Sequence, residues 1–205
     1  MGTNIMMCAE QRVDSQWRLL GPLIDNPDYD PAENPEEPRL KPVEIYDVRN
    51  YDLFSILADV RNASDGPGRL DVIAPPRGMP PDLSPEISAW VSCFDSDSLQ
   101  TPSWLTLREL LAFDWEHVSN HPTYDQLAGT YVVDALVRDS SGALVYHLAR
   151  IEPLAGDEFL ARPPSPHATY ATYAELAGKK FMEGVLRPLQ EAGDPDDVRI
   201  VFWFW

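Results

Sequence analysis

Arginine and aromatic side chains beside predicted helix ends are the residues of this chain best suited to binding chemistry. Arg49 and Tyr51 lie where a helix-like stretch at 50–60 begins, and Arg61 and Asn62 follow that stretch. Guanidinium groups next to an aromatic ring are typical of sites that hold phosphorylated or nucleotide-like ligands. The spacing therefore indicates a binding site at the two ends of this helix.

Further residues of the same type lie in two other segments. Arg77 is part of a proline-rich loop at 75–81, and Ser103 and Trp104 precede a helix expected to begin at Thr106. Backbone N–H groups at a helix start attract anions. The predicted ligand-binding set is therefore Arg49, Tyr51, Arg61, Asn62, Arg77, Ser103 and Trp104.

We expect four of these residues, Arg49, Arg61, Arg77 and Trp104, to meet in one cleft, because binding groups gather at element ends and in stiff loops. Such a cleft would be a positive pocket within a negative surface, which selects a compact anion and rejects long nucleic acid. In the alternative interpretation, Trp104 belongs to the core and each arginine pairs with a separate nearby carboxylate such as Asp52, Asp59 or Asp82. Arg61 in particular could pair with Asp59 or Glu109.

Common catalytic and metal-binding motifs are absent from the sequence. It contains no GxGxxG, GxxxxGK[ST], GxSxG, HExxH or CxxC. His117 and His121 have the i,i+4 spacing of two metal ligands on one helix turn, but Pro122 disfavours a helical conformation at His121. The sequence therefore predicts no catalytic residue, metal or cofactor, and it favours a binding protein over an enzyme.

Composition narrows the classes of partner. The 205 residues include 33 acidic and 16 basic side chains, a net charge of −17 that disfavours nucleic acid and anionic membranes as partners. No segment approaches the ~20 apolar residues of a membrane span. Two cysteines are too few for a disulfide scaffold. We expect residues 1–205 to form a single domain and the protein to be located in the cytoplasm. The composition is compatible with an oligomer.

The predicted elements indicate an α+β (or α/β) fold with a central mixed sheet. Segments 3–13 and 198–204 read as strands buried on both sides, so we expect them to be neighbours in that sheet. A short strand at 17–20 is expected to pair with the first of them. A hairpin is expected from the strands at 130–138 and 143–151. Helices and long proline-rich loops cover the sheet.

Local capping signals place the helices. Asn50 caps the first helix, and Ser84 begins a short one. Thr106 and Glu109 form a capping box, which leaves residues 102–104 as a turn. A second box at Thr172 begins the last helix, 172–192.

That last helix contains an internal proline. Pro188 predicts a kink or break near Gly184, because proline removes a helical hydrogen bond. Gly193 is expected to end the helix.

Residues 25–42 are rich in proline and acidic side chains, with Arg39 and Lys41 as bases. This composition predicts a surface loop or arm. Two interpretations remain open: a solvated acidic loop, or an acidic contact surface for a partner.

Four blocks, 49–62, 76–86, 103–115 and 193–204, resemble a family of small, mostly uncharacterised proteins of bacteriophages and actinomycetes. Members typically open with Met-Gly-Cys-Asp-Ile-His, contain Ser-Trp-Leu-Thr-Leu, and close near Val-Arg-Ile-Val-Phe-Trp-Phe. Here Asn4 replaces the Asp and Met6 the His. Those two groups would suit a metal or acid–base site in relatives. The resemblance thus implies a phage-type protein and, if its relatives are enzymes, one that binds its ligand without turnover.

Three function hypotheses follow. The first is an anti-defence accessory protein that sequesters a small phosphorylated or nucleotide-derived ligand in the host cytoplasm. The second is an acidic inhibitor that covers a basic surface of a host protein. The third is a nucleotide hydrolase in which Asp52, Asp59 or Asp82 works with an arginine.

Overall fold

A four-stranded antiparallel sheet lies at the centre of the computed structural model, which describes residues 3–33, 37–62, 69–95, 98–122, 131–138, 144–150 and 170–205. The strand order is β2-β1-β10-β5. The strands are β1 (Ile5–Val13), β2 (Gln16–Leu19), β5 (Gln100–Thr106) and β10 (Val198–Phe204). The fold is therefore α+β, and its central sheet is antiparallel rather than mixed.

Pairing of β1 with β10 confirms that the first and last predicted strands are neighbours. The register runs from Ile5 opposite Phe204 to Gln11 opposite Val198. All seven residues of β10 are buried, as its nearly uninterrupted apolar sequence predicts. A strand apolar on both faces needs cover on both sides, and the helices supply it.

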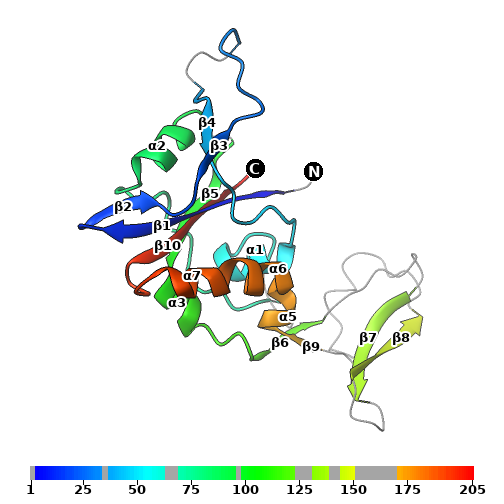
Figure 1. The fold of residues 1–205 in the computed structure, drawn as a ribbon. Helices are drawn as coiled ribbons and strands as arrows, with labels where there is room; N and C mark the ends of the chain where they lie inside the picture. Colours follow the sequence, from blue (N-terminus) through cyan, green and yellow to red (C-terminus); the bar gives the residue numbers. More distant parts are fainter. Residues whose placement is uncertain are drawn as a thin grey trace.

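Most helices pack on one face of the sheet (Figure 1). They are α1 (Tyr51–Ala58), α3 (Leu107–Ala112), α5 (Tyr173–Ala177), α6 (Lys179–Phe181), the π-helical turn η1 (Met182–Leu186) and α7 (Arg187–Ala192). The main core lies between these helices and alternate side chains of β1 and β10. On the other face, α2 (Pro85–Val91) packs Trp90 against Met6 and Trp203.

The capping residues predicted from sequence begin their helices. The Asn50 side chain accepts the Leu53 N–H at 3.1 Å, and both Thr capping boxes form. Ser84 precedes α2, but its side chain makes no capping hydrogen bond.

The predicted turn at 102–104 is wrong, because these residues belong to β5. Ser103 and Leu105 are buried while Trp104 and Thr106 are half-buried, which is the two-residue alternation of a strand. The strand runs directly into α3, so the capping box marked the helix start and gave no information about the segment before it.

Two breaks divide the last helical segment. The π-helical turn η1 contains Gly184, whose carbonyl has no N–H donor at Pro188, so the predicted break near Gly184 is confirmed. A second break falls at Gly178, whose φ of 81° leaves the helical region. The sequence analysis did not anticipate this second break.

Three two-stranded pairs complete the described structure. β3 (Leu23–Asp25) pairs with β4 (Leu40–Pro42), and β6 (Val118–Pro122) pairs with β9 (Tyr170–Thr172). The predicted hairpin is confirmed as β7 (Tyr131–Arg138) and β8 (Leu144–Arg150); its turn, 139–142, lies outside the described residues. Within the ranges given above, no helix has the length and apolar character needed to cross a membrane.

Candidate functional site

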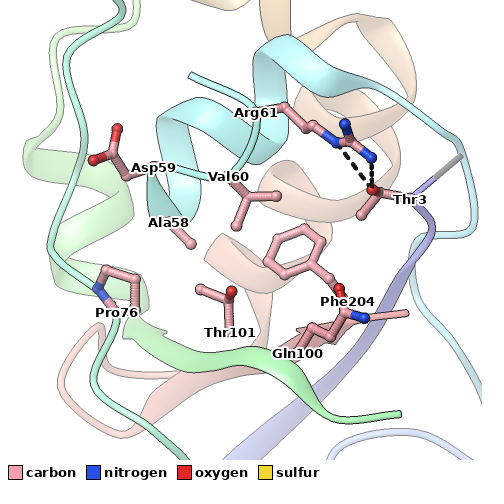
Figure 2. A pocket seen from close by; sticks show the side chains of 9 residues that line it. All are labelled: Thr3, Ala58, Asp59, Val60, Arg61, Pro76, Gln100, Thr101 and Phe204. Carbon is pink, nitrogen blue, oxygen red and sulfur yellow. Dashed lines mark hydrogen bonds between the residues drawn. The ribbon is translucent and has the colours of Figure 1, made fainter. Parts of the chain in front are cut away.

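A pocket of about 470 Å³ opens where the end of α1 faces the start of β5 (Figure 2). We call it the Arg61 pocket. It is lined by Thr3, Ala58, Asp59, Val60, Arg61, Pro76, Gln100, Thr101 and Phe204. Segments from the beginning, middle and end of the chain thus meet at one place.

Backbone strain is concentrated around this pocket. Among the described residues other than glycine, five have positive φ. Asp14 and Ser15 form the β1–β2 turn, whereas Asp59 (φ 60°), Arg61 (φ 62°) and Thr101 (φ 45°) all line the pocket. Such conformations cost about 1–3 kcal/mol each and tend to occur at functional sites.

The wall formed by the end of α1 is fixed by a small polar network. Asp59 is the left-handed C-cap, and its N–H bonds the carbonyls of Phe54 and Ser55. Its carboxylate accepts hydrogen bonds from Arg69 at 2.6 Å and Asn62 at 2.7 Å. The Asp59 charge is therefore compensated, and the chain after α1 is held in its turn.

The opposite wall is a β-bulge. Phe202 pairs with Ser103 and Phe204 pairs with Gln100, so Thr101 and Pro102 together oppose a single residue. In the common bulge whose first residue has positive φ, that residue is usually glycine. A β-branched threonine there is an outlier, and its backbone shapes the pocket beside Phe204.

Arg61 supplies the cationic group of the pocket. Its Nε and Nη2 donate to Thr3 Oγ1 at 3.1 and 2.9 Å, the contact drawn in Figure 2. The guanidinium also lies 5.7 Å from the centre of the Tyr51 ring, whose hydroxyl accepts the Thr3 N–H at 3.4 Å. Nearby, Arg49 donates to Asn4 Oδ1 at 3.1 and 2.5 Å.

Arg77, Ser103 and Trp104 form a separate group. The Arg77 guanidinium lies 4.8 Å from the centre of the Trp104 ring and is ion-paired with Glu109. Its backbone N–H donates to Ser103 Oγ at 3.2 Å. Partial burial raises the pKa of Glu109, but hydrogen bonds from Arg77 and Thr106 outweigh it and hold that pKa below its usual range.

The structure therefore divides the predicted binding set. Arg61 lines the pocket, whereas Arg49, Arg77 and Trp104 do not. For Arg77, the alternative of pairing with its own carboxylate is correct.

The sequence analysis missed the contributions of Thr3, Gln100, Thr101 and Phe204 to the pocket. A signal was present for Thr101, since a proline that follows within a strand is confined to an edge or a bulge.

A second polar cluster, centred on Arg199, lies on the α2 face of the sheet. Arg199 is 2% exposed; its Nε donates to Glu10 at 2.6 Å and its Nη1 to Asp82 at 2.8 Å. The guanidinium is flanked by the Trp17 ring at 4.0 Å and the Trp104 ring at 5.6 Å. This arrangement ties β10 to β1 and to the loop before α2, and it engages the Arg199 guanidinium with protein groups.

Over the same described ranges, no group of three or more His, Cys, Asp or Glu side chains is placed to hold a metal ion. The His117 ring stacks on Tyr173 with centroids 6.2 Å apart. The His121 side chain lies outside the described residues. Comparison of the chain with protein-family models, curated proteins and solved structures finds no match.

Proposed function

We propose that the protein binds a small phosphorylated or nucleotide-derived ligand in the Arg61 pocket. The observation that supports this most is the coincidence of an arginine fork with three strained backbone positions around one cavity. A volume of about 470 Å³ falls within the range of ~300–1,000 Å³ typical of small-molecule sites.

The lining suits an anion with an apolar part. Arg61 presents two donors, Nε and Nη2, to a single oxygen, Thr3 Oγ1. A phosphate oxygen in that position would accept the same donors in charge-assisted bonds, which are about twice as strong as neutral ones. Ala58, Val60 and Phe204 offer the apolar surface beside it.

The arrangement favours holding a ligand over converting it. Asp59, the carboxylate of this pocket, is engaged by Arg69 and Asn62 and is poorly placed to move a proton. We propose accordingly that the protein acts as a phage-type anti-defence accessory protein that sequesters its ligand in the host cytoplasm.

Isothermal titration calorimetry tests the ligand class with three probes: adenosine 5′-monophosphate, adenosine and inorganic phosphate. We expect the nucleotide to bind and adenosine to bind at least tenfold more weakly, because adenosine lacks the charge that Arg61 recognises. Unchanged nucleotide after incubation, measured by chromatography, is the result expected of sequestration.

Arg61→Gln is the diagnostic variant, and Arg108→Gln is its control. Arg108 lies outside the pocket lining, in an exposed pair with Asp196. Removing the Arg61 charge should weaken nucleotide binding at least tenfold, while the control binds like wild type. If the two variants bind equally, or if no probe binds the wild-type protein, the proposal is overturned.

A further inference from the structure

The ribbon formed by β3 and β4 exposes apolar side chains outside the central sheet. Leu23, Ile24 and Leu40 are 41%, 39% and 44% exposed. In Figure 1 this ribbon and the described part of the loop that joins its strands project from the body, away from α3 and α7. Exposed leucines on neighbouring strands of a projecting ribbon are typical of an interaction surface.

Strand register separates the two faces of the ribbon. Leu23 pairs with Pro42 and Asp25 pairs with Leu40, so Leu23 and Leu40 share one face. Lys41 lies on the other face, where its Nζ is 5.8 Å from the centre of the Trp90 ring of α2 and 3.4 Å from Glu44. Lys41 thus contacts α2 from one face of the ribbon, whereas Leu23 and Leu40 are exposed on the other face.

Negative charge lies at the loop end of this apolar face. In the described part of the adjoining loop, the exposed carboxylates are those of Asp25, Asp28, Asp30 and Glu33. Asp25 has a cation nearby, Arg39, at 3.7 Å, and both side chains are more than three-quarters exposed. A pair this open to solvent neutralises little of the field.

The base of the loop is pre-organised by Asn26, which is only 6% exposed. Its Nδ2 donates to Glu37 Oε1 at 2.9 Å, its backbone N–H donates to the Arg39 carbonyl at 2.8 Å, and its Oδ1 accepts the Asp28 N–H. A surface ordered before binding loses less entropy on binding.

We propose that the Leu23/Leu40 face, with its rim of carboxylates, docks on a cationic protein surface that has an apolar centre. Charge complementarity selects this occupant. A second copy would bring two chains of net charge −17 and two acidic rims together, and nucleic acid or an anionic membrane would be repelled. This inference is independent of the Arg61 pocket and uses none of its residues.

Two synthetic peptides of equal charge serve as probes: one alternates Lys with Leu, and the other alternates Lys with Ser. Binding to the immobilised full-length protein is followed by surface plasmon resonance at low and at physiological salt. We expect the Lys/Leu peptide to bind about tenfold more tightly, because it alone offers an apolar surface to Leu23 and Leu40.

Charge variants locate the binding surface. Asp28→Asn/Asp30→Asn/Glu33→Gln removes three charges from the rim, and Glu116→Gln/Glu183→Gln/Glu191→Gln removes three from exposed positions elsewhere. The rim variant should slow association at least tenfold at low salt, whereas the control should retain most of the wild-type rate. Equal effects of the two variants would show diffuse attraction and overturn the proposal.

Apolar variants test the leucines separately. Leu23→Ser/Leu40→Ser should speed dissociation of the Lys/Leu peptide about tenfold. Leu111→Ser/Val118→Ser, which changes two apolar residues of comparable exposure on other elements, should not. An unchanged dissociation rate in the first variant would overturn the proposal. So would wild-type self-association, by sedimentation velocity, that only the first variant abolishes, because the occupant would then be a second copy.

Discussion

Replacing Glu10 with glutamine should destabilise the protein strongly, because it removes a charge from a buried pair. Glu10 is fully buried and Arg199 is 2% exposed. The Glu10 carboxylate accepts two donors, the Arg199 Nε–H and the Ser84 N–H, each at 2.6 Å. A glutamine of the same size has one acceptor oxygen for these two donors, so one donor would lose its partner.

The size of the effect follows from the environment of Arg199. Removing one member of a buried ion pair typically costs about 3–5 kcal/mol. Asp82 still accepts a hydrogen bond from Arg199 Nη1 at 2.8 Å, but its side chain is 61% exposed and compensates only in part. We therefore expect a loss at the lower end, about 3 kcal/mol, which corresponds to a fall in Tm of roughly 6–12 °C for a chain of this length.

Urea denaturation followed by tryptophan fluorescence and circular dichroism measures this loss. Asp197→Asn is the matched control, since Asp197, just before β10, pairs with Arg12 of β1 but both side chains are more than a third exposed. That change should cost at most about 1 kcal/mol. A combined Glu10→Leu/Arg199→Met variant should be more stable than Glu10→Gln. If Glu10→Gln costs no more than the control, the buried-pair reasoning is refuted.

Three further predictions concern helix capping, pH and thiol accessibility. Thr106→Ala should lower stability by about 0.5–2 kcal/mol, because the hydroxyl accepts the Glu109 N–H; an unchanged Tm would show that this cap is dispensable. The pKa of Glu109 is lower in the folded protein than its ordinary value of 4.5, so the ionised carboxylate contributes to the free energy of unfolding above pH 4.5, and this contribution is lost as the pH falls through the folded-state pKa. Glu109→Gln should therefore make the free energy of unfolding depend less on pH below 4.5. Unfolding free energies measured between pH 7 and 3 check this expectation. Burial raises the pKa of the Cys8 thiol to about 12, whereas Cys93 is exposed. A thiol reagent at pH 8 should therefore label Cys93 in the native protein and should label both cysteines only in denaturant. Labelling of Cys8 in the native protein would contradict the packing of β1.

Features that depend on adjacent residues could be predicted from the sequence. Asn50, Thr106 and Thr172 each cap a helix with a side chain that reaches only three residues ahead, so the local pattern contains the whole interaction. The burial of β10 could also be predicted from its sequence, because a strand that is apolar on both faces needs cover on both sides.

Features that depend on distant residues could not be predicted in this way. The contact of Arg61 with Thr3 joins positions 58 apart, and nothing near either residue specifies it. Arg77 was correctly singled out as a residue at the end of a stiff loop, but its partner Glu109 lies 32 positions away, so its pairing was beyond local reasoning. β5 was mistaken for a turn because its alternation is short and it meets α3 without a loop.

The pairing of β1 with β10 also constrains how the chain folds. Glu10 and Arg199 are 189 positions apart, so the two central strands can join only after almost all of the intervening chain is available. Until then β1, which is apolar on both faces, has β2 on one side and an open edge on the other. Such an edge is a template for pairing with other chains, and contacts this distant in sequence form slowly. Newly made protein should therefore be most prone to aggregate in the interval before β10 is inserted, and a lower concentration of newly made chains should improve its yield, because open β1 edges then meet less often.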